Sequence, residues 1–228
     1  MIEFLFLDLD DTILDFQKAE HIAISKTLAE FGLPGEAEVL RRYSVINKAH
    51  WEALERKEMT RDEVVVGRFR VLFREYGIDV DARRVADRYE ANLSVGHWFL
   101  PGAPEALERL SRRYKLYLAS NGTARVQAGR LKSANISHYF QQIFVSQEIG
   151  ANKPDILYFQ RCFDRIPGFD PARAMMVGDS LTSDILGGIR AGIATCWVNP
   201  HHKDSGSVTP DHQIESLSQL EALLDTLQ

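Results

Sequence analysis

The sequence predicts an α/β fold, in which a mostly parallel sheet is flanked by helices and an all-helical segment is inserted after the first strand. A short apolar run over residues 3–7 ends abruptly in acidic residues, as a buried parallel strand entering a loop does. Residues 16–95 then show only helical periodicity. After Pro101 and Gly102, strand and helix patterns alternate, which is typical of parallel strands joined by helices.

The inserted segment is predicted to contain four helices, over residues 17–31, 37–57, 61–76 and 82–95. Thr60 is the expected N-cap of the third helix, and Glu63, three residues later, completes a capping box. No part of the segment has the pattern of a strand. The insert is therefore expected to be all-helical.

The remaining chain predicts the sheet and its covering helices. We expect helix 103–113, strand 115–119, helix 123–133, strand 142–145, helix 154–165, strand 173–177, helix 182–191, strand 194–198, a short strand 212–214 and a helix from about 216. The predicted domains are an α/β core of residues 1–15 and 96–228 and a helical cap of residues 16–95. A cap inserted there lies over the carboxyl edge of the sheet, where open α/β sheets bind ligands.

Composition restricts the partners of the chain. Lys and Arg number 27 against 32 Asp and Glu, and the net charge of -5 argues against a nucleic acid polymer or an anionic membrane surface as partner. Cys162 and Cys196 lie in apolar segments without paired or metal-ligand spacing, which favours buried free thiols in a reducing compartment. No apolar run approaches the roughly 20 residues that span a bilayer, and residues 1–9 lack the basic start of a signal segment. We expect a cytoplasmic protein.

A group of acidic residues, Asp8-Leu9-Asp10-Asp11-Thr12, directly follows the first predicted strand. Residues two apart in an extended chain point the same way, so Asp8 and Asp10 are expected to face one site. Two carboxylates at this spacing can divide a reaction, one as nucleophile and the other as proton carrier. A solvated acidic turn that caps the next helix has the same pattern, so the motif alone is not decisive.

Three later segments place complementary chemistry at the ends of other elements. Ser120-Asn121-Gly122 follows a strand, where a hydroxyl and free backbone N–H groups can hold phosphate oxygens. Lys153 precedes a helix and can offset negative charge, and Gly178-Asp179 follows another strand, with Asp184 five residues after Asp179. Singly, these segments are equally an N-capped turn, a solvated lysine and a helix cap. Together and in this order they favour one phosphate site.

In these four motifs, Asp8-x-Asp10-x-Thr12, Ser120, Lys153-Pro154 and Gly178-Asp179 followed by Asp184, the chain resembles the haloacid dehalogenase-like (HAD) superfamily. The resemblance covers the whole chain and extends to the helical cap. A narrower resemblance, to the bacterial pyrimidine 5'-nucleotidase branch, rests on Asp10-Asp11-Thr12-Ile13-Leu14-Asp15-Phe16, Asn47-Lys48-x-x-Trp51, Arg68-Phe69, Ser120-Asn121-Gly122 and Ala194-Thr195-Cys196-Trp197-x-Asn199.

The resemblance implies a Rossmann-like core and a Mg²⁺-dependent phosphoric monoester hydrolase that forms a phosphoaspartate on Asp8. It implies that Asp10 protonates the leaving group and later takes a proton from the attacking water. Asp8, Asp179 and the backbone carbonyl of Asp10 are the implied Mg²⁺ ligands, since this ion prefers hard oxygen donors. Without a cation, such crowded carboxylates would raise one another's pKa.

The same resemblance assigns the neighbouring polar residues. Ser120, the amides near Asn121 and Gly122, and Lys153 are implied to stabilise the phosphoryl group. Thr12 is expected to hydrogen-bond to the loop of the nucleophile. Asp184 is expected to orient Lys153 or a metal-bound water rather than to bind metal directly.

A small phosphorylated metabolite is the expected partner, and the branch resemblance implies a pyrimidine nucleoside monophosphate. Asn47 and Trp51, four residues apart, share a helix face and are candidate contacts to a base, with Phe16 stacking from the hinge. The alternative is that Trp51 and Phe16 belong to the core of the cap.

Other functions fit parts of the pattern. A phosphatase of phosphoglycolate or a sugar phosphate, or a phosphosugar mutase, would share all four motifs. A dehalogenase would lack an acid at the position of Asp10, because halide leaves unprotonated. A phosphorylated signalling receiver is about half as long and carries its aspartate on a later strand. A non-catalytic phosphate-binding protein is disfavoured by the intact Asp8, Asp10, Lys153 and Asp179.

Overall fold

A six-stranded, all-parallel sheet forms the centre of the structure, a computed structural model that describes residues 1–227. The strand order is β3-β2-β1-β4-β5-β6. The strands are β1 Phe4–Leu7, β2 Lys115–Ser120, β3 Phe140–Val145, β4 Ala174–Gly178, β5 Ala194–Val198 and β6 His212–Ile214. The predicted α/β fold with a parallel sheet and flanking helices is confirmed.

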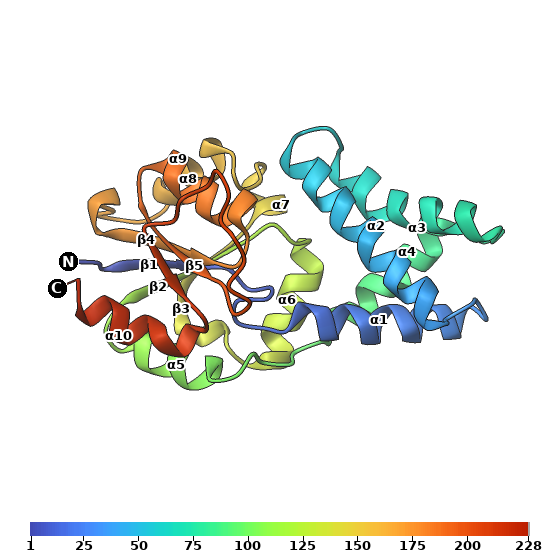
Figure 1. Cartoon of the computed structure of the whole chain (residues 1–228), viewed down its shortest axis with the longest axis horizontal. Coiled ribbons are helices and arrows are strands. Elements are labelled where there is room, and N and C mark those ends of the chain that lie inside the picture. Colours follow the sequence, from blue (N-terminus) through green and yellow to red (C-terminus); the bar gives the residue numbers. More distant parts are fainter. Residues whose placement is uncertain (228) are drawn as a thin grey trace.

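Helices cover both faces of this sheet (Figure 1). Leu5 and Leu7 of β1 pack into a cluster with α5 (Ala103–Ser111), α6 (Ala124–Ala134) and α10 (Leu220–Asp225). Phe4 and Phe6, which alternate with them, pack on the opposite face beside α8 (Ile156–Phe163), and α9 (Leu186–Ala191) lies on that side too. A single strand therefore contributes to two separate apolar layers, which explains why its sequence is continuously apolar.

Four helices between β1 and α5 form a bundle at one end of the molecule, which we call the cap (Figure 1). They are α1 Phe16–Glu30, α2 Ala37–Glu55, α3 Arg61–Tyr76 and α4 Ala82–Leu93. The bundle has its own apolar cluster, in which the rings of Tyr43, Phe69 and Tyr89 lie 5.2–5.6 Å apart. The predicted capping box of Thr60 and Glu63 is present at the start of α3.

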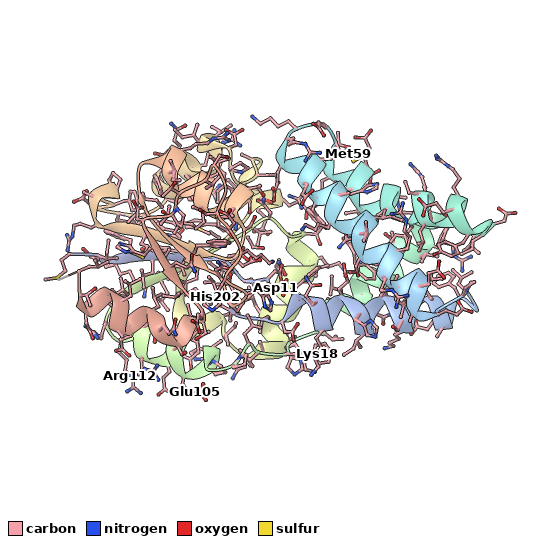
Figure 2. The ribbon with its side chains drawn as sticks, viewed as in Figure 1. Asp11, Lys18, Met59, Glu105, Arg112 and His202 are labelled. Atoms are coloured by element: carbon pink, nitrogen blue, oxygen red, sulfur yellow. The ribbon has the colours of Figure 1, made fainter. Side chains whose placement is uncertain are left out.

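The chain enters and leaves the cap along one paired segment. The amide of Asp15 donates to the carbonyl of Trp98 at 2.8 Å, and Leu14 forms an antiparallel bridge with Phe99. The predicted limits of the cap, at 15/16 and 95/96, fall in or beside this segment. The division into two domains stays a prediction. Figure 2 shows Asp11 at the junction, between the sheet and the cap helices.

Three predicted helices differ in detail. The one expected from 182 begins as a π-helical turn, Leu181–Ile185, where Ser180 accepts a hydrogen bond from the amide of Ser183. The one expected from 154 begins at Ile156, because Asp155 caps it, and the last begins as a 3₁₀ turn over Leu217–Gln219. The short α7, Ser146–Ile149, was not predicted. Within residues 1–227, no helix is both long enough and apolar enough to cross a membrane.

Candidate active site

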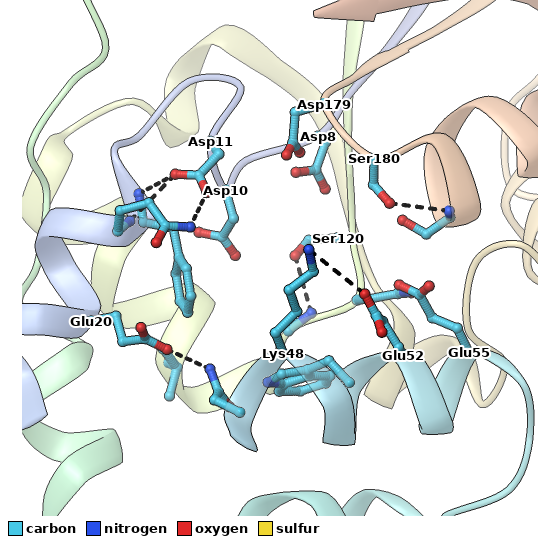
Figure 3. A pocket seen from close by; sticks show the side chains of 18 of the residues that line it. Asp8, Asp10, Asp11, Glu20, Lys48, Glu52, Glu55, Ser120, Asp179 and Ser180 are labelled. Atoms are coloured by element: carbon cyan, nitrogen blue, oxygen red, sulfur yellow. Dashed lines mark hydrogen bonds and ion pairs between the residues drawn. The ribbon is translucent and has the colours of Figure 1, made fainter. Parts of the chain in front are cut away.

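The acidic motif, the serine loop and the second aspartate motif meet at the carboxyl edge of the sheet. Leu7 of β1 is in register with Leu118 of β2 and Val177 of β4, so the residues that follow these strands converge. They border a cavity of about 500 Å³ between the core and the cap (Figure 3). Its lining includes the predicted site residues Asp8, Asp10, Phe16, Asn47, Trp51, Ser120, Asn121, Gly122, Lys153, Asp179 and Asp184.

Lys153 is a buried cation that lines this cavity, with a side chain only 1% exposed. Its Nζ donates to Asp8 Oδ1 at 2.7 Å, to Asp184 Oδ1 at 2.5 Å and to the carbonyl of Ala119 at 2.6 Å. Burial alone would lower the pKa of Lys153, but the carboxylates of Asp184 and Asp8 outweigh it and hold the pKa above its ordinary value. Lys153 is therefore charged, and Asp184 orients it.

Gly178 explains how Asp184 reaches this position. A Cβ atom at 178 would overlap the carboxyl group of Asp184. That carboxyl group also accepts a hydrogen bond from the amide of Ser180, at 3.1 Å from Oδ2. The glycine of the Gly178-Asp179 motif is thus required by the close approach of Asp184 to the end of β4.

Carboxylates are in excess around this lysine. Burial, followed by repulsion from Asp184 and Asp8, raises the pKa of Asp179 well above its ordinary value. Burial also raises the pKa of Asp8 to about 8, against the attraction of Lys153. One lysine does not neutralise three neighbouring carboxylates, so the site is short of positive charge.

The same three carboxylates fit a divalent cation. Oxygen atoms of Asp8, Asp179 and Asp184 all lie within 4.8 Å of one another, and hard oxygen donors are what Mg²⁺ prefers. Acidic side chains also outnumber basic ones in the cavity lining, with Glu20, Glu52 and Glu55 of the cap facing the aspartates of the core (Figure 3). A phosphate dianion would be repelled from such a cavity unless a cation were bound with it.

The serine loop is fixed by hydrogen bonds of its own. Asn121 exchanges two hydrogen bonds with the backbone of Lys153, its Nδ2 donating to the carbonyl and its Oδ1 accepting from the amide, both at 2.9 Å. The amide of Gly122 donates to Ser120 Oγ at 3.1 Å. The side chain of Asn121 therefore joins the serine loop to the lysine loop, a role that its predicted place beside the phosphate did not include.

Thr12 does not make the hydrogen bond expected of it. Its side chain is buried, and its Oγ1 has no hydrogen-bond partner among the described residues. The turn is closed instead by the backbone, since the amides of Ile13 and Leu14 donate to the carbonyl of Leu9 at 3.0 and 2.9 Å. The hydroxyl is not needed to hold the loop, and the expectation for Thr12 is corrected accordingly.

On the cap side, Asn47 belongs to a buried polar chain. Its Nδ2 donates to Glu20 Oε1 at 2.6 Å, and its Oδ1 accepts from Arg68 Nη1 at 2.7 Å. Phe16 packs partly against the apolar cluster of the cap, whereas Trp51 lies outside that cluster among the described residues. Trp51 is thus better placed than Phe16 to contact a molecule in the cavity.

Three further residues at the site were not predicted. Gln127 and Arg130 of α6 contact the carboxylate of Asp10, and Arg130 is completely buried. Arg61 of α3 reaches from the cap into the core, where it donates to the carbonyls of Asn121 and Gly122 at 2.9 and 3.0 Å. Nothing in the sequence marks these residues, because the contacts of Arg61 with Asn121 and of Gln127 and Arg130 with Asp10 join positions at least 60 apart in the chain.

Comparison with known proteins agrees with this geometry. A model of the haloacid dehalogenase-like hydrolase family matches residues 5–198. The chain is 39% identical to the pyrimidine 5'-nucleotidase PynA of Streptococcus pneumoniae, covering 98% of this chain and 95% of that protein. It is 29% identical to the pyrimidine 5'-nucleotidase YjjG of Escherichia coli, with 97% of each covered.

A solved structure is similar over nearly its whole length. The crystal structure of the HAD-hydrolase YfnB of Bacillus subtilis superposes with a TM-score of 0.93 at 38% identity, covering 98% of this chain and 99% of that chain. That protein was bound to magnesium and showed an interdomain movement.

Proposed function

The chain belongs to the haloacid dehalogenase-like hydrolase family, and we propose that it is a Mg²⁺-dependent phosphatase that forms a phosphoaspartate on Asp8. We further propose that its substrates are pyrimidine nucleoside 5'-monophosphates. The predicted resemblance to this superfamily is confirmed by the family match over residues 5–198. The predicted resemblance to its pyrimidine 5'-nucleotidase branch is confirmed by the relatives named above.

One observation carries the chemical part of the proposal. A buried lysine holds Asp8 at 2.7 Å, and a second carboxylate, Asp10, borders the same cavity. Asp8 is fixed by Lys153 and its side chain is only 10% exposed, as suits a nucleophile held in one orientation. Asp10 is more exposed, at 28% of its side chain, as suits a group that exchanges protons with substrate and water. A dehalogenase would have no use for that second acid.

In the first half-reaction, an oxygen of Asp8 forms a bond to phosphorus while the bond from phosphorus to the ester oxygen breaks. Asp10 gives its proton to that departing oxygen, so the alcohol leaves neutral. Lys153 contacts Asp8, and Ser120 borders the same cavity; both offset the charge on the phosphoryl oxygens. Asp184 keeps the ammonium of Lys153 directed at this position.

In the second half-reaction, a water attacks the phosphorus of the phosphoaspartate and Asp8 leaves as a carboxylate. Asp10, now ionised, takes the proton of that water and returns to its starting state. One carboxylate therefore serves both steps without another base. The arrangement requires that Asp10 keep its orientation between the two proton transfers.

The oxygens of Asp8 and Asp179 are the proposed ligands of Mg²⁺, with the carbonyl of Asp10. When bound, the cation would neutralise charge on the phosphoryl group and orient it toward Asp8. Asp184 lies within the same 4.8 Å cluster, but its Oδ1 is engaged with Lys153, so we assign it to the lysine.

The relatives and the cavity support the nucleotide part of the proposal. PynA and YjjG carry the name pyrimidine 5'-nucleotidase and align over almost the whole chain, cap included. A cavity of about 500 Å³ has room for a nucleoside monophosphate, and Trp51 presents a ring at its cap side. YfnB, bound to magnesium, shows movement between its domains, which supports a cap that closes over the substrate.

Release of inorganic phosphate tests this proposal across substrates. We expect kcat/KM for the 5'-monophosphates of uridine, deoxyuridine and thymidine to exceed that for hexose phosphates and phosphoglycolate. Trp51→Ala should reduce turnover of these nucleotides much more than turnover of a small aryl phosphate, which does not reach the cap. If phosphoglycolate or a hexose phosphate has the highest kcat/KM, the nucleotidase assignment is wrong and only the more general assignment as a phosphatase remains. Formation of an isomeric sugar phosphate without release of phosphate would indicate a mutase.

The proposed compartment is the cytoplasm. Cys162 and Cys196 are both free and buried, as expected of thiols in a reducing environment. A small phosphorylated metabolite, rather than a nucleic acid polymer or a membrane, is the proposed partner.

A further inference from the structure

Both oxygens of the Asp10 carboxylate are held by one helix. Arg130 Nη1 contacts Asp10 Oδ1, and Gln127 Nε2 donates to Asp10 Oδ2 at 2.7 Å. The same Gln127 Nε2 lies 2.8 Å from Ser120 Oγ, to which it also donates. The side chains of α6 therefore fix the orientation of Asp10 relative to the serine that borders the phosphate position.

The buried guanidinium of Arg130 is not fully paired. Its side chain is 0% exposed, and Asp10 is the carboxylate that it contacts. Its Nη2 has no hydrogen-bond partner among the described residues, and Gln127 Oε1 lacks one as well. Burial of an incompletely paired guanidinium destabilises a fold, and an apolar side chain of similar size would serve packing better. The residue is therefore better explained by what it does to Asp10 than by stability.

Arg130 also contacts the segment by which the chain leaves the cap. Its Nε donates to the carbonyl of Gly96 at 3.0 Å. On the preceding residue, a Cβ atom at Gly129 would lie 2.7 Å from the carbonyl oxygen of Ser94. Helix α6 thus packs so closely on residues 94–96 that Arg130 joins this exit segment directly to Asp10. Its guanidinium stands over the ring of Phe16, at the entry to the cap, 5.6 Å from the ring centroid.

We propose that Arg130, supported by Gln127, is a positioning residue for Asp10, fixing this carboxylate between its two proton transfers and tying its orientation to the exit segment of the cap. The inference rests on the proposed acid–base role of Asp10. Arg130 and Gln127 each hold one oxygen of the Asp10 carboxylate, so the carboxylate keeps one orientation from the first proton transfer to the second. Because Arg130 also contacts Gly96, the orientation of the Asp10 carboxylate depends on the position of the cap relative to the core.

The test is a double-mutant cycle with two substrates. Arg130→Gln, Asp10→Asn and the double variant are compared with the unchanged protein, using uridine 5'-monophosphate and p-nitrophenyl phosphate. Misplacement of a catalytic group by about 1 Å can cost about 10²-fold in rate, so Arg130→Gln should lower kcat on the nucleotide by about that factor, with little change in KM. The aryl phosphate has a good leaving group and should still release a burst of p-nitrophenol, followed by slow hydrolysis of the phosphoaspartate.

In the Asp10→Asn background, Arg130→Gln should cost little more, because a residue that acts through Asp10 has nothing left to position. Arg130→Lys, which keeps the charge, should recover part of the rate. Gln127→Ala removes no charge and should show the same pattern more weakly. This variant keeps the test valid if Arg130→Gln folds poorly. Arg161→Gln is the matched control, because Arg161 binds backbone carbonyls of Ile149 and Gly150 away from the cavity, and its kcat should be unchanged.

Two outcomes would overturn the inference while leaving the phosphatase intact. One is that the losses from Arg130→Gln and Asp10→Asn multiply in the double variant. The other is that Arg130→Gln slows the burst and the steady state of both substrates by one common factor. Full activity in Asp10→Asn alone would instead refute the proposed role of Asp10, and the inference with it.

Discussion

The guanidinium of Arg61, at the start of cap helix α3, donates to the carbonyl oxygen of Gly122 in the serine loop of the core, at 3.0 Å. Arg61 also donates to Asn121, Ser146 and Asn152, and its charge lies 5.5 Å from the ring centroid of Trp51. One side chain therefore fastens the cap to the loop that we propose binds phosphate.

We expect Arg61→Ala to lower kcat/KM by about 10- to 100-fold on every substrate, since a hydrogen bond to a charged group contributes about 1.5–3 kcal/mol. Loss of the contact frees both the serine loop and the cap. Steady-state kinetics of phosphate release measures the effect. Arg70→Ala, on an exposed position of the same helix, is the control and should behave as the unchanged protein. Equal kinetics in the two variants would contradict the role given to Arg61.

Asp8→Asn should reduce turnover by about 10⁶-fold, the scale on which removal of a nucleophile acts. The fold should be retained, because a neutral amide relieves the excess of buried carboxylate around Lys153. In metal-free buffer, we therefore expect a Tm at or above that of the unchanged protein. Phosphate release and thermal melting measure the two effects, with exposed Asp79→Asn as the control. Turnover in Asp8→Asn comparable to that of the unchanged protein would refute the covalent mechanism.

Chelation should remove activity, and added Mg²⁺ should restore it. Apart from turnover, Mg²⁺ should raise the Tm of the unchanged protein, because a ligand that binds only the folded state stabilises it. The shift should be absent or much smaller in Asp179→Asn, which lacks one carboxylate of the three-residue cluster. Differential scanning fluorimetry with and without Mg²⁺ gives this readout. Undiminished hydrolysis in excess chelator would count against a metal-dependent site.

A pH dependence is expected from Glu55, whose Oε2 accepts a hydrogen bond from Thr182 of the core at 3.0 Å. Burial, and to a smaller extent repulsion from Asp184 and Glu52 against the attraction of Lys153, raises its pKa from 4.5 to about 7. The carboxyl group of Glu55 therefore keeps its proton to a higher pH in the folded protein than in the unfolded chain. The free energy of unfolding should fall as pH rises from about 4.5 to about 7, because the ionised form is destabilised by burial.

Glu55→Gln stays neutral and can still bond to Thr182, so it should escape this loss. Its stability advantage over the unchanged protein should grow between pH 4.5 and 7 and then stay constant. Denaturant unfolding of the metal-free proteins at several pH values measures the difference. Glu36→Gln, at an exposed position of the cap, is the control and should show no such trend. A constant difference across the range would show that Glu55 titrates normally in the folded protein.

Local signals in the sequence were enough to predict most of the fold. Thr60 and Glu63, three residues apart, predict the start of a helix, and the predicted bounds of β5 and β6 agree with the structure at both ends. The convergence of Asp8, Ser120 and Asp179 also follows from parallel strands that share one carboxyl edge. These features depend on neighbours in the chain or on strand order, both of which the sequence displays.

The contacts of Asp10 could not be predicted in the same way. Arg130 lies 120 positions from it and reads in the sequence as an ordinary helical arginine. Its partner depends on how closely α6 packs against residues 94–96, which is decided by three-dimensional packing at Gly129. The prediction for Thr12 was wrong because backbone hydrogen bonds to Leu9 close the turn that its hydroxyl was expected to hold.

The pairing of Leu14 with Phe99 has a consequence for how such a protein can change over generations. Since the two ends of the cap lie side by side, the sheet is joined to about 80 inserted residues as it would be to a single short hairpin. We therefore expect changes in the inserted helices that keep the Leu14–Phe99 pairing and the contact of Arg61 with the serine loop to leave the strand order and the position of Asp8 undisturbed. In the proposed phosphatase, a new leaving group would then require changes in the inserted helices alone, while the residues at the carboxyl edge of the sheet stay the same.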